Sequence, residues 1–140
     1  MLYKRYGNNL VARLEVGEDI SEQVLAIAEK EKIKVASISA IGAVNDCTVG
    51  VFNTETKVYD EKHLTGSNFE IAGLTGSLTT MDGKPYAHLH IVCANHNCEA
   101  IGGHLINSRI SLTCEIFMQI IDAEIERKYS DEVGINLMNF

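Results

Sequence analysis

The sequence predicts an α+β fold in which a largely antiparallel sheet of about seven strands carries one main helix after the first strand. Only one segment, close to the N-terminus, repeats its apolar residues with the period of a helix. The other apolar segments are short, rich in β-branched residues and separated by turn residues at hairpin spacing, which favours antiparallel pairing. The 140 residues contain no repeat, linker or low-complexity stretch, so we expect a single domain over residues 1–140.

The first predicted strand and the helix after it lie in the N-terminal quarter. Residues 9–16 (NLVARLEV) alternate between an apolar and a more polar face, and Gly17 ends this strand. Asp19 can cap the helix, and the charged run 29–34 ends it. The apolar stripe of the helix is formed by Ile20, Val24, Leu25, Ile27 and Ala28.

The middle of the chain predicts four strands joined by turns. The strands cover residues 35–44, 47–52, 57–64 and 69–78. Turns are expected at residues 45–46, 53–56, 66–68 and 81–84, the last containing an Asp-Gly pair. The segment 57–64 is the most polar of the four strands, so we expect it at a sheet edge.

The last third predicts strands over residues 86–93 and 99–106, with a loop at 95–97 between them. Residues 110–121 (ISLTCEIFMQII) are rich in β-branched side chains and favour a central strand, with a helix as the competing interpretation. The tail after Asp122 is charged and then ends in the apolar segment 135–140. We expect this segment to pack on another surface, such as a neighbouring subunit.

Composition and charge exclude several classes of protein. The net charge is −7 and the basic residues are scattered, whereas affinity for nucleic acid comes largely from clustered Lys and Arg. Direct DNA binding is therefore disfavoured. No apolar run reaches the length of a membrane span, and we expect a cytoplasmic protein without a membrane partner. The four cysteines form no CxxC pair, so we expect reduced thiols.

Three histidines carry the sharpest chemical signal in the sequence. His88 and His90 lie two residues apart in an extended segment, so their side chains leave the same face of a strand. His104 follows a Gly-Gly pair on what could be the returning strand. Three imidazoles converging from two strands would hold a divalent metal with open coordination positions. Zinc is the first choice, and Fe, Ni and Mn are alternatives because imidazole suits several metals.

Plainer roles remain open for these and the other histidines. A His-x-His pair in a strand can simply be hydrogen-bonded in a polar interior or at a subunit interface. His96 and Cys98, in the loop between the two histidine strands, could supply a further ligand or belong to an ordinary polar hairpin loop. His63 stands beside Lys62 on a polar strand and is expected at the surface.

Two charged residues, Glu70 and Arg13, could accompany a metal. Glu70 could orient an imidazole or act as an acid or base, and Arg13 could hold an anionic substrate. Both are candidate catalytic residues, and surface or subunit-interface ion pairs are the alternative roles. Glu115 interrupts an apolar strand, and we expect it to meet Arg109, Arg13 or a metal-bound histidine, because an unpaired buried carboxylate is costly.

Five short motifs occur in a fixed order along the chain. They are Arg-Leu-Glu-x-Gly-Glu-Asp-Ile at residues 13–20, Ile-Gly-Ala-Val at 41–44, Phe-Glu-Ile-x-x-Leu-x-Gly at 69–76, His-Leu-His at 88–90 and Gly-Gly-His-Leu at 102–105. In this order they resemble the PPC domain, named for plants and prokaryotes, over roughly residues 13–115. The resemblance implies a seven-stranded antiparallel sheet flanked by helix, and assembly as a homotrimer.

The resemblance also implies that His88, His90 and His104 are metal ligands. In plants the domain follows AT-hook motifs in nuclear DNA-binding proteins; this chain has no such motif and is like the stand-alone prokaryotic members. The fold also resembles that of acetolactate decarboxylase, whose zinc is held by three histidines. Such a likeness of fold says little about the reaction.

These observations predict a small cytoplasmic homotrimer that binds a divalent metal through three histidines. It would act on, or sense, a small anionic or carbonyl ligand; no particular reaction follows from the residues, and no nucleophile–base pair is recognisable. A second hypothesis is a DNA-binding or transcription-associated module. A third is a structural or interaction trimer without metal, with the histidines at its interface.

Overall fold

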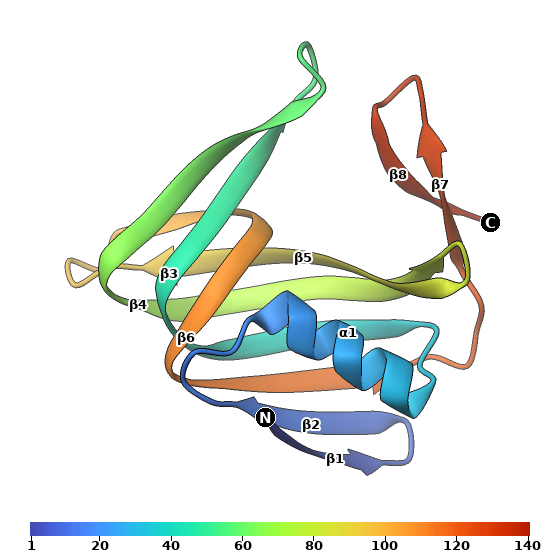
Figure 1. The fold of residues 1–140 in the computed structure, drawn as a ribbon, viewed down its shortest axis with the longest axis horizontal. Coiled ribbons are helices and arrows are strands. Elements are labelled where there is room, and N and C mark those ends of the chain that lie inside the picture. Colours follow the sequence, from blue (N-terminus) through green and yellow to red (C-terminus); the bar gives the residue numbers. More distant parts are fainter.

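The computed structural model describes residues 1–140 and contains eight strands and one helix (Figure 1). In chain order these are β1 (Leu2–Tyr6), β2 (Asn9–Leu14), α1 (Ile20–Glu31), β3 (Ala36–Asn53), β4 (Val58–Met81), β5 (Lys84–Ala94), β6 (Ala100–Ile120), β7 (Glu126–Ser130) and β8 (Ile135–Asn139). The structure contains no helix of the length and hydrophobicity needed to span a bilayer.

All eight strands belong to one sheet with mixed pairing. The order is β1-β2-β6-β3-β4-β7-β8, and β5 pairs with both β4 and β6. Every pair is antiparallel except β4 with β7, which meet in parallel at Thr80 and Glu126. The α+β class is confirmed, but the expected sheet of about seven antiparallel strands is corrected to eight strands with mixed pairing. The single helix follows the short hairpin of β1 and β2.

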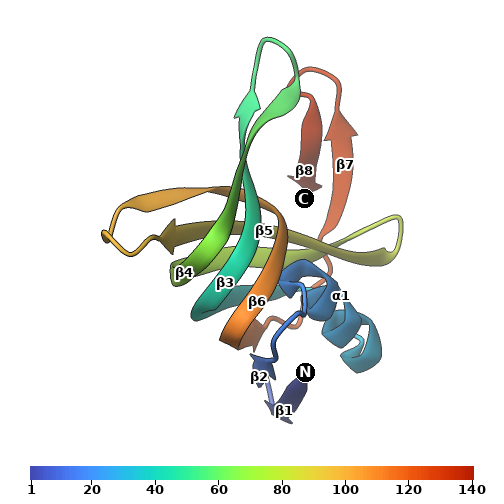
Figure 2. The same ribbon diagram turned by 60° about the vertical axis from the view of Figure 1, so that its left-hand side comes forward.

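Three long strands, β3, β4 and β6, replace several shorter predicted ones. β3 is 18 residues long and runs through the turn expected at 45–46, and β4 is 24 residues long and runs through the turn expected at 66–68. Register shifts in β3 between Ala40 and Gly42 and between Val44 and Asp46 absorb the extra residues, while Gly66 takes a positive φ of 87°. Turn-forming residues therefore bend these strands without ending them, and Figure 2 shows the resulting curvature.

Local signals at other positions are confirmed. The β4–β5 turn has Asp82 and Gly83 at φ values of 52° and 72°, the conformation that an Asp-Gly hairpin requires. Residues 110–120 lie in β6, so the helical alternative for this segment is wrong. The apolar tail does pack on the same chain, where β7 and β8 form a hairpin (Figure 1). All four cysteines are free thiols.

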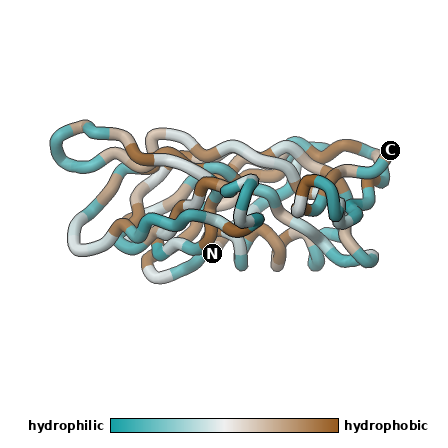
Figure 3. Tube along the Cα trace, turned by 90° about the horizontal axis from the view of Figure 1, so that it is seen from above, coloured by the Kyte–Doolittle hydropathy of each residue, from teal (hydrophilic) through white to brown (hydrophobic).

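The core lies between α1 and the sheet. Residues of α1 that face it include Ile20, Val24, Ile27 and Ala28, and they join a cluster of 27 buried apolar residues. Figure 3 shows apolar segments recurring along the strands, whereas hydrophilic residues gather at the turns. The helix packs on β5 and β6, the two strands that carry the three histidines (Figure 1).

The N-terminus of α1 is tied to β6 by a buried polar network. The carboxylate of Asp19 is 5% exposed and accepts hydrogen bonds from the backbone N–H of Glu22 at 2.9 Å and of Ser108 at 2.7 Å. The Ser108 hydroxyl accepts in turn from the backbone N–H of Ile20 at 3.0 Å. One residue therefore caps the helix and fixes its position against the sheet.

Replacing Asp19 by alanine is expected to lower the free energy of unfolding by about 3 kcal/mol, because a helix cap is lost and buried N–H groups are left unpaired. Chemical denaturation measures the change. Asp122→Ala, at an exposed position, is the matched control and should shift stability by no more than about 0.5 kcal/mol. Equal stability of the two variants would contradict the role assigned to the network.

Candidate metal centre

β5 and β6 bring the three histidines together. His88 and His90 leave the same face of β5, because side chains alternate along a strand. His104 on β6 lies directly opposite His90 in the antiparallel register and also opposite Gly50 on β3. The predicted returning strand is therefore present, and the backbone pairing places His104 beside His90 and two residues along the strand from His88.

The imidazoles are close enough to share one ion. One ligand nitrogen from each of His88, His90 and His104 lies within 4.8 Å of the others. The ring centroids are 5.1 Å apart for His88 and His90, 5.1 Å for His88 and His104, and 5.6 Å for His90 and His104. Nδ1 of His104 is buried and has no hydrogen-bond partner. A buried nitrogen without a partner, within a set of three imidazoles, fits a metal ligand.

The surroundings of His88 and His104 favour the neutral form of each imidazole. Burial, reinforced by the neighbouring His88 and His90, lowers the pKa of His104 to about 4. Burial, with Arg127 and His90 as further causes, also lowers the pKa of His88. Neutral imidazole is the protonation state that ligates a metal, so these two side chains do not have to lose protons before binding one near neutral pH.

Glycines allow the strands to approach closely beneath the histidines. A Cβ atom added to Gly76 on β4 would lie 2.2 Å from the backbone oxygen of His88, and one added to Gly103 on β6 would lie 2.7 Å from the backbone oxygen of Gly50. Neither position can carry a side chain without moving the strand opposite. The Gly-Gly pair before His104 therefore has a packing role that holds the histidine strands in place.

A cavity of about 260 Å³ opens beside His88 and His104. It lies between the end of the β3–β4 hairpin and the C-terminal β7–β8 hairpin, which rise side by side in Figures 1 and 2. Tyr59 stacks on the His104 ring with centroids 4.8 Å apart and an interplanar angle of 21°. Tyr86 and Arg127 also line this cavity. The sequence singled out none of these three residues, because no local motif links them to the histidines.

The other candidate residues stand apart from the three histidines within the chain. Glu70 is exposed and pairs with Ala94, four residues and about 13 Å along β5 from His90 at the rise of a strand. Arg13 is exposed on β2, forms an ion pair with Glu15 at 3.1 Å and lies opposite Glu115. Glu115 is exposed as well, so it does not need the buried partner that the sequence suggested.

The remaining histidines and the loop cysteine lie at the surface. His63 contacts Asp46 at 3.0 Å and is exposed, as predicted. His96 and Cys98 are exposed in the loop between β5 and β6, and neither belongs to the group of three imidazoles. The polar-loop interpretation of this segment therefore fits the structure better than a second ligand set.

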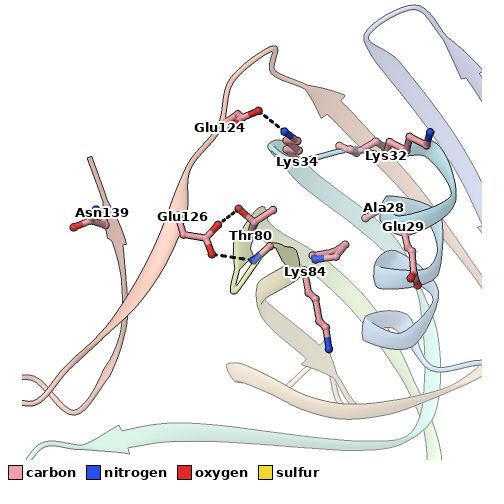
Figure 4. Close-up of a pocket in the computed structure, with 12 residues that line it drawn as sticks. Ala28, Glu29, Lys32, Lys34, Thr80, Lys84, Glu124, Glu126 and Asn139 are labelled. Carbon is pink, nitrogen blue, oxygen red and sulfur yellow. Dashed lines mark hydrogen bonds and ion pairs between the residues drawn. The ribbon is translucent and has the colours of Figure 1, made fainter.

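A second cavity, of about 610 Å³, lies between the end of α1, the β4–β5 turn and the start of β7 (Figure 4). Two of its three acidic residues, Glu124 and Glu126, already have partners. Glu124 forms an ion pair with Lys34, and Glu126 accepts hydrogen bonds from the Thr80 hydroxyl and the Gly83 backbone N–H. It contains no histidine or cysteine, so the chemistry points to the smaller cavity beside the imidazoles.

Comparison with known proteins identifies relatives over the whole chain. A family model described as the Plants and Prokaryotes Conserved domain matches residues 1–122. A candidate DNA-binding protein from Bacteroides thetaiotaomicron, known from a crystal structure, is 30% identical in sequence to this chain, with a TM-score of 0.94. The match covers 99% of this chain and 96% of that protein. A metal-containing protein from Archaeoglobus fulgidus is 31% identical in sequence, with a TM-score of 0.88, and the match covers 100% of this chain and 99% of that protein.

Acetolactate decarboxylase from Bacillus subtilis shares the fold alone. It is 15% identical to this chain, with a TM-score of 0.58, and the match covers 84% of this chain and 54% of the enzyme. The likeness predicted from sequence is thus confirmed as a likeness of fold. No curated protein sequence matches the chain.

Proposed function

The chain belongs to the Plants and Prokaryotes Conserved domain family, and we propose that it binds one divalent metal ion through His88, His90 and His104. The observation that carries this proposal is the convergence of three imidazoles, one of which, His104, has a buried nitrogen without a hydrogen-bond partner. The metal-containing relative from Archaeoglobus fulgidus supports it. Zinc is the first choice for three neutral imidazoles, with Fe, Ni and Mn as alternatives.

The bound ion would act on a small ligand in the adjoining cavity. Three protein ligands leave coordination positions open, and a divalent ion there supplies Lewis acidity toward a carbonyl or anionic oxygen. The chain's own contribution is to shape the cavity: Tyr59 packs against the His104 ring, and the hairpin of β7 and β8 covers one side. Glu70 and Arg13 remain candidates for a catalytic role only if another copy of the chain brings them to the histidines.

We propose further that the protein assembles as a cytoplasmic homotrimer. One row of paired residues crosses β1, β2, β6 and β3 and consists of Leu2, Arg13, Glu115 and Ile41. Leu2 and Ile41 in this row, and Phe117 beside it, are each more than half exposed, at 60%, 57% and 54%. Large apolar side chains gathered on one sheet face are typical of a surface covered by another subunit.

Binding to DNA is the second candidate function. It is favoured by the description of the relative from Bacteroides thetaiotaomicron, and it is opposed by the net charge of −7, because phosphate contacts need clustered cations. A mobility-shift titration at several salt concentrations separates the two functions. Tight binding of this chain alone at physiological salt would favour the DNA-binding function.

The metal proposal is tested by elemental analysis of protein purified without a histidine tag. We expect close to one divalent ion per chain in the wild type, and almost none after His88, His90 and His104 are all changed to alanine. The matched control changes the exposed His63 and His96 to alanine and should keep its metal. Absence of metal from the wild type, or unchanged content in the triple variant, would refute the proposal.

A further inference from the structure

Arg127 on β7 is a buried cation without an anionic partner. Its side chain is held by Nε donating to the Thr79 hydroxyl at 2.8 Å, Nη1 to the backbone oxygen of Asn136 at 2.9 Å and Nη2 to the Ser77 hydroxyl at 3.3 Å. The residue is 6% exposed, and no carboxylate lies within 4.0 Å of its guanidinium. All three acceptors are neutral.

Such an arrangement is costly unless an anion completes it. Removing a guanidinium from water without a counter-charge is unfavourable, and buried charges in proteins are normally paired. A guanidinium has five N–H groups, and the three hydrogen bonds leave two, one on each terminal nitrogen. Two N–H groups, one on each terminal nitrogen, match in number the two oxygens of a carboxylate.

The cavity beside Arg127 has the charge that an anion requires. Besides Arg127 it is lined by Lys57, by His88 and His104, and by the rings of Tyr59 and Tyr86, with no aspartate or glutamate in its wall. In a chain with a net charge of −7, a cavity with two cations and no acidic residue is a clear departure from the average surface.

Neighbouring contacts hold the two cations in place before any ligand arrives. The Arg127 guanidinium carbon lies 4.9 Å from the centroid of the Tyr86 ring, and Lys57 Nζ donates to the backbone oxygen of Asp131 in the β7–β8 turn at 2.5 Å. Ser77 and Thr79, which accept from Arg127, pair on the sheet with His88 and Tyr86. The anchor for an anion and the candidate metal ligands are therefore built on the same stretch of β4 and β5.

We propose that this cavity binds the carboxylate of a small organic acid, with Arg127 holding the carboxylate through both terminal nitrogens and Lys57 adding a second positive charge. The tyrosine rings offer flat apolar walls for the carbon skeleton of the acid. The inference deepens the proposed function, because it assigns the ligand class of the cavity next to the three histidines. It also stands apart from it, because Arg127 and Lys57 are not metal ligands.

The test is isothermal titration calorimetry of the full chain with benzoate and propionate, each compared with its neutral amide, and with inorganic phosphate. We expect both carboxylates to bind the wild type at least about tenfold more tightly than benzamide and propionamide, the factor that one charge-assisted contact supplies. Arg127→Gln should weaken carboxylate binding by at least about tenfold and leave metal content unchanged. Lys57→Gln should weaken it by a smaller factor.

The outcomes separate the anion site from the metal centre. Carboxylate binding that persists in the triple histidine variant, together with loss of its metal, supports both proposals. If only the metal proposal fails, the wild type holds no metal but still binds the carboxylates more tightly than the amides by the same ratio. Equal binding of acid and amide, no binding of either acid, or tighter binding of phosphate than of both acids would overturn the assignment. If Arg127→Gln melts at a much lower temperature than the wild type, the amide comparison and Lys57→Gln, whose side chain is exposed, decide the result.

Discussion

Replacing Gly76 by alanine is expected to lower the free energy of unfolding by about 3 kcal/mol or more and to weaken metal retention at the same time. The added Cβ would lie 2.2 Å from the backbone oxygen of His88, 2.7 Å from Cδ2 of Leu89 and 2.9 Å from its Cα. Two of these atoms belong to the backbone of β5, so the clash cannot be relieved by turning a side chain. The histidine strand itself has to move.

Gly73→Ala is the matched control for this prediction. Gly73 lies on the same strand, and a Cβ added there would have no atom within 4 Å. Chemical denaturation and elemental analysis of both variants measure the two effects separately. A Gly76 variant as stable and as rich in metal as the Gly73 variant would show that close approach of β4 and β5 does not position His88.

Metal binding is expected to stabilise the folded protein strongly. A ligand that binds only the folded state adds about 4 kcal/mol at a thousandfold excess over its Kd. For a domain of 140 residues this raises the melting temperature by on the order of 10 °C. Adding zinc to protein stripped with a chelator should produce this rise, and adding the chelator again should reverse it. Differential scanning calorimetry measures the shift.

The change of His88, His90 and His104 to alanine should abolish this stabilisation. The variant in which the exposed His63 and His96 are changed should keep it, because neither residue belongs to the group of three imidazoles. An equal rise in the triple variant would mean that zinc stabilises the protein through another site. No rise in the wild type would mean that the three imidazoles do not bind zinc in the folded chain.

The histidine centre was open to prediction because its signal is local. His88 and His90 share a strand face through the alternation of side chains, and the Asp-Gly turn and the helix cap at Asp19 depend on residues within a few positions of each other. His104 was a longer step, which rested on an expected returning strand. The pairing of His90 with His104 supplies it.

Strand continuity was harder to predict. Asn45 and Asp46, and the segment 66–68, have the composition of turns, yet β3 and β4 continue through both places. A bulge and a turn draw on the same residue types, and only the strand alongside decides between them. The first strand, Leu2–Tyr6, was missed because its residues are mostly exposed and show no apolar alternation.

By itself, the sequence determined the α+β class, the helix after an early strand, the histidine pair on one strand face and the disadvantage for DNA binding, because each depends on composition or on residues two to four apart. Only the tertiary structure decided that Tyr59, Tyr86 and Arg127 stand around the imidazoles. These residues lie 27 or more positions apart along the chain, on β4, β5 and β7. Their meeting depends on how the long strands bend and where the C-terminal hairpin packs, which no local pattern encodes.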